Sequence, residues 1–80
     1  MDLRHIRYFV AVATTRNFTR AAEQMHIAQP PFSRQIAMIE RTLGVKLFER
    51  NSRNVALTPA GEHFMKDCRN VLGQFEEACI

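Results

Sequence analysis

Apolar and polar residues follow a helical period over the first 44 positions of the chain. Residues three and four positions apart share one face of an α-helix, so a stripe at this spacing predicts an amphipathic helix. Three stripes are present: one near the N-terminus, one after Asn17, which is a good N-cap, and one that ends at Gly44, a natural helix stop. The expected core-facing residues are Leu3, Ile6, Phe9 and Ala13 in the first helix, Phe18, Ala21, Ala22 and Met25 in the second, and Phe32, Ile36, Ile39 and Leu43 in the third.

The pattern changes after Gly44. Two short runs, 47–50 and 55–57, flank four polar or turn-forming residues, which predicts a β-hairpin. Thr58 and Pro59 then form a helix-start signal, because the hydroxyl caps the first turn and proline lacks only an N–H that would be unpaired there. A last helix is expected from Pro59 to the chain end. Gly73 lies inside it, where glycine costs up to ~1 kcal/mol relative to alanine, and close packing is the reason we expect for it.

These elements predict a mainly α fold. A short helix, a tight turn around His26 and a longer helix form the helix-turn-helix arrangement, and a hairpin directly after it is a wing. The expected architecture is therefore a winged helix-turn-helix of three helices and a short β-hairpin, followed by a long C-terminal helix.

Pro30 and Pro31 stand where the third helix is expected to begin. Proline is tolerated in the first helical turn and fixes φ, so the pair sets the direction of the helix rigidly. Arginine, glutamine and serine at such a helix end can hydrogen-bond base edges in the DNA major groove, whereas a stiff loop with a solvated polar face is the alternative interpretation. The residues expected to face outward are Gln29, Pro30, Ser33, Arg34, Ala37 and Arg41.

Basic residues are concentrated in the first three-quarters of the chain. The net charge is +3, yet residues 1–61 contain nine basic and four acidic side chains, and residues 62–80 contain two and four. Nine of the eleven basic residues are arginine, which suits bidentate contacts to phosphate or guanine. This distribution favours a polyanionic partner for the first part of the chain, and a solvated charged surface is the alternative.

Three segments carry a family resemblance: LRHIRYFVAVA near the N-terminus, NFTRAAEQMHIAQPPFSRQIAMIERTLGVKLFER in the centre, and VALTPAGEHF around the start of the last helix. In this order and spacing they resemble the N-terminal DNA-binding domain of LysR-type transcriptional regulators, over nearly all 80 residues. The resemblance implies sequence-specific binding to a two-fold symmetric double-stranded DNA operator, with the third helix in the major groove and the wing at the minor groove. The DNA-binding residues that it implies are Gln29, Pro30, Pro31, Ser33 and Arg34, with Arg53 at the wing tip and Arg50 nearby.

The resemblance also divides the chain into a winged domain, residues 1–58, and a linker helix, residues 59–80, that pairs with its copy in a homodimer. An apolar stripe on this helix supports pairing, because little chain remains to cover it. The stripe comprises Phe64, Cys68, Val71 or Leu72, Phe75 and Cys79. The alternative is that it folds back onto the first helix through Tyr8 and Val12. Full-length members of the family add a larger inducer-binding domain, so a small-molecule inducer and higher oligomers are expected only if such a C-terminal domain exists.

Other functions have little support in the sequence. The histidines and cysteines follow no zinc spacing, the three glycines form no phosphate loop, and Ser33, His26 and Asp67 are common residue types that need not form a catalytic triad. We therefore expect neither an enzyme nor a metal or cofactor site. The lack of a signal peptide or of an apolar run near ~18 residues predicts a cytoplasmic location with no membrane contact. A winged module that serves only protein assembly is the remaining rival, although outward arginines at Arg34 and Arg53 favour DNA.

Overall fold

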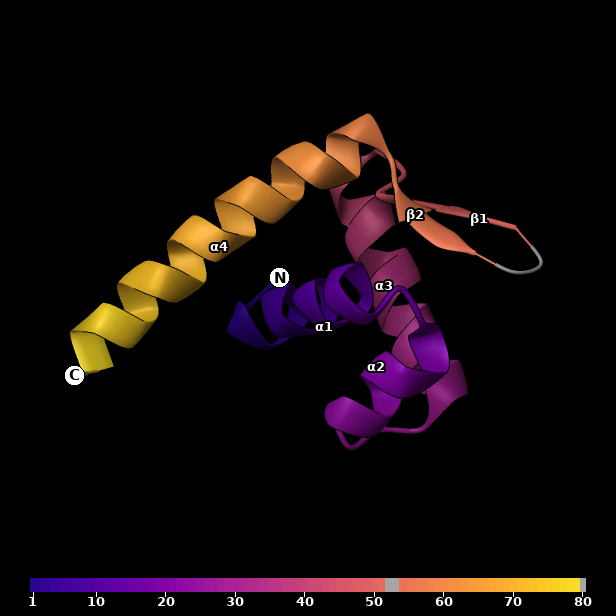
Figure 1. Ribbon diagram of the computed structural model, residues 1–80, viewed down its shortest axis with the longest axis horizontal. Helices are drawn as coiled ribbons and strands as arrows, with labels where there is room; N and C mark the ends of the chain where they lie inside the picture. Colours follow the sequence, from indigo (N-terminus) through magenta and orange to yellow (C-terminus); the bar gives the residue numbers. More distant parts are fainter. Residues whose placement is uncertain (52–53, 80) are drawn as a thin grey trace.

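The computed structural model describes residues 1–51 and 54–79, with side chains up to Gly73. Within these residues the elements are α1 (Leu3–Thr15), α2 (Phe18–Gln24), α3 (Gln29–Leu43), the antiparallel strands β1 (Phe48–Arg50) and β2 (Val55–Leu57), and α4 (Pro59–Cys79). The first three helices cluster together, the hairpin projects from one side, and α4 runs away at an angle (Figure 1). The expected winged helix-turn-helix with a long last helix is confirmed.

Local signals in the sequence set the ends of the helices. The side chain of Asp2 caps α1 by accepting the N–H groups of Arg4 and His5, and Asn17 caps α2 by accepting the N–H of Arg20 at 2.9 Å. Gly44 ends α3 with φ of +73°, a left-handed conformation that glycine adopts without a steric penalty. The connections on either side of α2 are short, residues 16–17 before it and 25–28 after it. The second connection brings α2 and α3 into contact as a helix-turn-helix pair.

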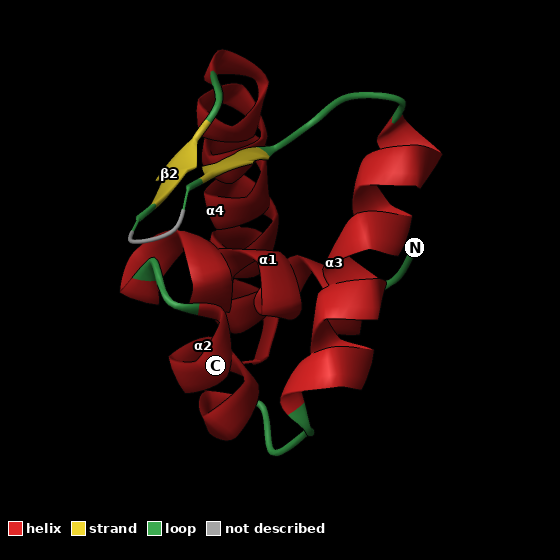
Figure 2. Ribbon diagram, turned by 90° about the vertical axis from the view of Figure 1, so that its right-hand side faces the viewer, coloured by secondary structure: helices red, strands yellow, loops and turns green. Residues whose placement is uncertain are grey.

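The core lies where α1, α2 and α3 meet and is closed by the base of the hairpin. Phe9 is fully buried at its centre, with its ring 5.2 Å from the ring of Phe48 and 4.8 Å from that of Phe64, measured between centroids. The side view separates α3 from the upright α4, with α1 between them (Figure 2). The largest fully buried side chains are Phe9, Val12, Phe32, Ile36, Ile39, Leu47 and Cys68.

Leu43 corrects the predicted core of α3. Its side chain is 38% exposed, because it is the last helical residue before Gly44 and lies beyond the region that α1 and α2 cover. It borders a shallow depression that Val45 and Phe64 also line. The periodic pattern is therefore right through Ile39 and wrong at the helix end.

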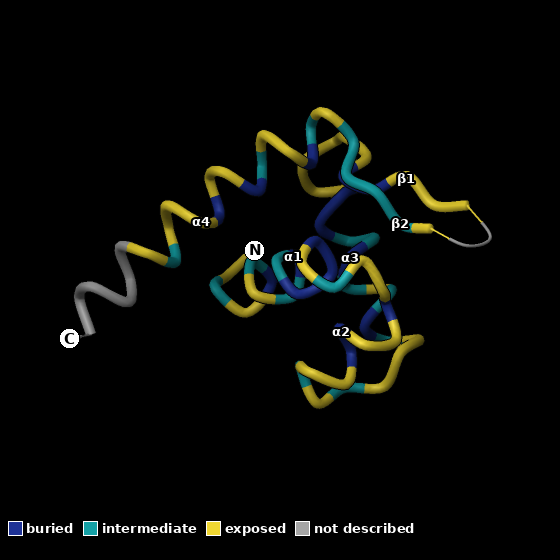
Figure 3. Tube along the Cα trace, in the orientation of Figure 1, coloured by how far each residue is buried: buried dark blue, intermediate teal, exposed yellow. Residues whose placement is uncertain are grey.

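The first turns of α4 pack against the body of the domain. A Cβ atom at Gly61 would collide with the carbonyl oxygen of Leu47, so only glycine allows this approach between the helix and the residue that precedes β1. Met65 and Cys68 are buried, whereas Val71 is 44% exposed. From Arg69 to Gly73 the helix is exposed except at half-buried Leu72, as the exposure map shows (Figure 3).

The stripe on α4 is thus covered in part by its own chain. Phe64 and Cys68 pack on the body of the domain, as the fold-back alternative predicted for part of the stripe, although the ring that Phe64 meets belongs to Phe9. The side chains of Phe75 and Cys79 lie outside the described residues. At Gly73, no described atom outside its own helix backbone lies within 4 Å of the position a Cβ would take, so packing within this chain does not explain the glycine.

Candidate nucleic-acid interface

The start of α3 offers few backbone N–H groups to a ligand. Ala28 precedes the helix without a side-chain cap, and the N–H of Phe32 donates to the Ala28 carbonyl at 3.1 Å. Pro30 and Pro31 have no N–H, so Gln29 alone keeps a free backbone donor in the first three helical positions. A ligand at this end of the helix would therefore meet side chains rather than a ring of backbone amides.

The side chains predicted to contact DNA from α3 lie together on its outward face. Gln29, Pro30 and Arg34 are exposed, and Pro31 and Ser33 are half-buried. The Nε2 group of Gln29 donates to Oγ of Ser33 at 2.7 Å, across one helical turn. This bond orients both groups and leaves Oε1 of Gln29 as an acceptor.

Arg34 carries a free charge on this face. Its guanidinium makes no ion pair and no hydrogen bond with any residue that the structure describes. A guanidinium group carries five N–H donors in a planar fork that fits guanine O6 and N7 or a phosphate. The arrangement of α3 therefore presents an unpaired basic fork beside a rigid helix start.

The hairpin places Arg50 against α2. Its guanidinium carbon lies 4.1 Å from the centroid of the Phe18 ring, in cation–π geometry. The backbone N–H of Asn51 donates to the Asn54 carbonyl at 3.0 Å, which closes the described part of the turn. Arg53, predicted at the wing tip, lies outside the described residues.

A cleft separates the outward face of α3 from the hairpin. Ala37 lines it on the α3 side, Lys46 and Arg50 line it on the strand side, and Thr58 lies at its end. Of the predicted DNA-binding residues, Arg50 lines this cleft, and those at the start of α3 do not. Lys46 adds a basic side chain that the sequence analysis had not assigned to the site.

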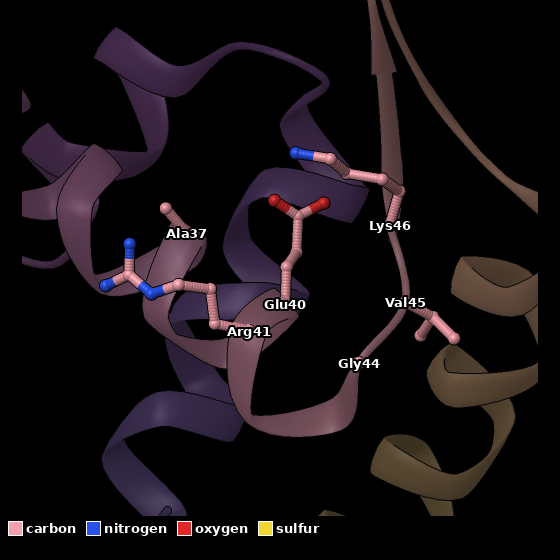
Figure 4. A pocket seen from close by; sticks show the side chains of 6 residues that line it. All are labelled: Ala37, Glu40, Arg41, Gly44, Val45 and Lys46. Carbon is pink, nitrogen blue, oxygen red and sulfur yellow. The ribbon is translucent and has the colours of Figure 1, made fainter.

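Glu40 is a buried residue that the sequence analysis missed. Its Oε2 atom accepts the N–H groups of Leu47 at 2.8 Å and of Phe48 at 3.3 Å, so α3 holds the start of β1. Figure 4 shows the Glu40 side chain between α3 and the segment through Lys46 that leads to β1. A signal was present, because positions 32, 36 and 40 share one helix face, and a carboxylate on a core face needs hydrogen-bond partners.

The other side of this segment is bonded to the start of α4. Oγ1 of Thr58 donates to the Lys46 carbonyl at 2.6 Å and accepts the N–H of Gly61 at 2.9 Å. The backbone N–H of Thr58 also donates to the Leu47 carbonyl at 3.0 Å. The base of the wing is therefore hydrogen-bonded both to α3 and to α4.

Other kinds of site find no counterpart in the described part of the chain. Among the described side chains, those of residues 1–51 and 54–73, there is no group of three His, Cys, Asp or Glu that could hold a metal ion. Within residues 1–51 and 54–79, no helix has both the length and the apolar character needed to cross a membrane. Burial raises the pKa of the Cys68 thiol from 9.0 to about 11, with a contribution from the charge of Asp67, so this thiol is held in its protonated form.

The fold and the surface define a winged helix-turn-helix protein with a basic outward face on its third helix. Residues 3–62 match the family described as bacterial regulatory helix-turn-helix protein, lysR family. The chain belongs to this family.

Individual relatives are similar over nearly the whole chain. A probable cat1 operon transcriptional activator of Acinetobacter lwoffii is 60% identical over 77 residues, which cover 96% of this chain and 25% of the relative. The crystal structure of a BenM_DBD complex with catB site 1 DNA has a TM-score of 0.93 and 47% identity, covering 99% of this chain and 88% of that one. A CbnR_DBD–DNA complex has a TM-score of 0.90 and 41% identity, with coverages of 98% and 90%. The chain spans 25% of the length of this Acinetobacter lwoffii relative and 26% of that of the Escherichia coli Hca operon transcriptional activator HcaR.

Proposed function

We propose that the chain binds double-stranded DNA sequence-specifically as the N-terminal domain of a LysR-type transcriptional regulator. The observation that carries the proposal is the unpaired guanidinium of Arg34 beside the rigid Pro30–Pro31 start of α3. The similarity to BenM_DBD and CbnR_DBD, both solved as DNA complexes, supports it. Transcriptional regulation would take place in the bacterial cytoplasm.

The proposed binding mode inserts α3 into the major groove and sets the wing at the neighbouring minor groove. A recognition helix commonly reads bases through residues near its N-terminus, which is where the outward polar set lies. Glutamine suits adenine, arginine suits guanine, and proline can contact a thymine methyl group by shape. In this mode the groove contacts come from Gln29, Pro30, Pro31, Ser33 and Arg34, and the wing contacts from Arg50 and Arg53.

The proposed domain division places DNA binding in residues 1–58 and homodimerisation in the linker helix, residues 59–80. Support comes from α4, which leaves the body of the domain and exposes Val71, with half-buried Leu72 beside it. Two-fold pairing would present two recognition helices to two half-sites of an operator. Binding of a small-molecule inducer, and any higher oligomer, would depend on a C-terminal domain beyond these 80 residues.

Selection from a randomised duplex pool tests the proposal directly. The purified 80-residue chain is mixed with the pool, bound duplexes are sequenced, and fluorescence anisotropy measures their affinity over a range of salt concentrations. We expect a two-fold symmetric motif, with affinity that falls steeply as salt rises because bound counterions are released from the phosphates. Sedimentation of the complex then gives the number of chains per duplex.

A folded sample that enriches no motif and shows no salt-dependent binding would contradict the proposal. An enriched motif without two-fold symmetry, bound by a single chain, would contradict only the dimer. The two parts of the proposal are therefore tested separately by one experiment.

A further inference from the structure

His5 is a buried polar side chain on α1 that the proposed DNA contacts do not use. Its Nε2 atom lies 2.9 Å from Oε1 of Gln35, a half-buried residue of α3. Gln35 directly follows Arg34 and lies one turn beyond Pro31. A hydrogen bond therefore joins α1 to the N-terminal half of α3, close to the residues proposed to contact DNA.

The geometry determines which group donates in this bond. Nδ1 of His5 accepts the N–H of Asp2 at 3.2 Å, as part of the capping box that starts α1. With Nδ1 as an acceptor, the ring hydrogen lies on Nε2 and is donated to Oε1 of Gln35. A protonated ring would keep that hydrogen, and its Nδ1–H would face Oδ1 of Asp2 at 3.1 Å. Nε2 is thus the donor in both charge states of the ring.

Aromatic contacts restrict the rotation of the His5 ring. Tyr8 packs edge-on against it, with 6.1 Å between ring centroids, and also packs against Phe32 of α3 at 5.4 Å. The first contact lies within α1, and the second joins α1 to the N-terminal half of α3. The donor of the bond is therefore held in place by its neighbours.

A hydrogen bond at this position can do what the apolar contacts around it cannot. Burial of Phe32 and Ile36 stabilises the packing of α3, but the hydrophobic effect is non-directional and tolerates a small rotation of the helix about its axis. A hydrogen bond weakens steeply when its length or angle changes, so it opposes that rotation. In a recognition site, each contacting side chain must lie within about 0.5 Å of its required position. A small rotation of α3 would therefore move Arg34 out of place.

We propose that His5 and Gln35 are positioning residues for base recognition, and that their bond sets the rotation of α3 which aims Ser33 and Arg34 at the bases. The inference rests on the proposed DNA-binding function. In this role Gln35 acts through the placement of its neighbours on α3 and has no contact with DNA.

The test compares the affinity of each variant for the selected operator duplex and for a scrambled duplex of equal composition. His5→Phe and Gln35→Met remove the bond while keeping a side chain of similar bulk. Each should lower the operator-to-scrambled affinity ratio roughly tenfold and leave scrambled-duplex affinity and its salt dependence unchanged. The affinity ratio of the double variant should fall no further than that of either single variant, because the bond between His5 and Gln35 is absent in all three. His5→Phe also removes the cap bond from Asp2, so its stability is measured separately.

Gln35→Glu is the conservative rescue variant. A carboxylate oxygen can still accept the Nε2 hydrogen of His5, so the affinity ratio should stay close to that of the wild type. The ratio is the decisive quantity, because an added negative charge weakens binding to both duplexes alike. If His5→Phe fails to fold, as judged by circular dichroism, the comparison of Gln35→Met with Gln35→Glu decides alone.

Several results would overturn the inference. If Gln35→Met lowers the affinity for both duplexes equally and reduces the salt dependence, Gln35 contacts phosphate. If the losses of the two single variants add in the double variant, His5 and Gln35 have separate roles. A wild-type ratio in Gln35→Met would show that the bond is not needed. By contrast, a wild-type chain that does not prefer the operator would overturn the proposed function itself.

Discussion

The carboxylate of Glu40 accepts the backbone N–H of Leu47 at 2.8 Å, so a side chain of α3 holds the first residues of the wing. The two elements that border the proposed DNA surface are thus joined by a bond from a buried charge. Buried carboxylates are stable only when hydrogen bonds replace the water they lose, and the N–H groups of Leu47 and Phe48 supply these bonds.

Replacing Glu40 should therefore destabilise the domain. Glu40→Ala leaves two buried N–H groups without an acceptor and should cost roughly 2–4 kcal/mol of unfolding free energy. Glu40→Gln keeps one acceptor oxygen and should cost less. Urea unfolding measures both effects, with Glu49→Ala, an exposed residue of β1, as the matched control. An Ala variant as stable as this control would contradict the bridging role.

Two glycines of α4 should respond in opposite directions to the same substitution. Gly61→Ala drives a Cβ into the Leu47 carbonyl oxygen and should cost about 1–3 kcal/mol, as overpacking does. Gly73→Ala meets open space inside a helix and should stabilise the chain by about 0.5–1 kcal/mol. Thermal unfolding at several protein concentrations compares the two. Destabilisation by Gly73→Ala that grows with concentration would place Gly73 at a contact between chains.

Arg34→Ala should reduce discrimination between operator and altered operator. Loss of a bidentate base contact costs about 1–3 kcal/mol at the specific site and little on random DNA. Anisotropy titrations with both duplexes measure the difference, and Arg69→Ala, an exposed arginine on α4, serves as the control. Equal losses on both duplexes would instead identify Arg34 as a phosphate contact.

The raised pKa of Cys68 predicts an unreactive thiol and a pH effect on stability. At pH 8 the folded thiol forms about 100-fold less thiolate than an unfolded one, because its pKa is about 11 rather than 9.0, so alkylation should be correspondingly slow. Iodoacetamide labelling of the Cys79→Ser variant, with and without urea, isolates this thiol. Rapid labelling of the folded variant would contradict the burial of Cys68.

The direction of the pH effect follows from the same shift. Below pH 9 the thiol is protonated in both the folded and the unfolded chain, and its contribution to stability is fully present. Between about pH 9 and 11 the unfolded chain loses the proton first, so this contribution falls as pH rises. Cys68→Ala should show a weaker decline over this range than the wild type in urea unfolding.

Most of the fold could be predicted from the sequence because it depends on local signals. The caps at Asn17 and Gly44, and the apolar spacing through Ile39, specify the helices and the face that each one buries. The exposure of Leu43 could not be predicted in this way, because it depends on where neighbouring helices end. Helical spacing shows which residues lie on the same face of a helix. It does not show how far along the helix other elements cover that face.

The candidate site was predictable where side chains point outward and not where they form bonds between elements. The exposed positions of Gln29 and Arg34 follow from helix geometry. The partners of His5 and Glu40 lie 30 and 7–8 positions away in the sequence, so only the folded chain reveals them. Stacking of Arg50 on Phe18 is likewise a contact between distant segments.

The two prolines that begin α3 have a consequence for the evolution of this surface. Because they remove backbone donors from the helix start, the specificity for a bound partner must come almost entirely from side chains such as Gln29, Ser33 and Arg34, which substitution can change. Substitutions there leave the buried bonds of the scaffold untouched. A duplicated gene could therefore acquire a new preferred sequence through very few mutations, without first having to recover a lost fold.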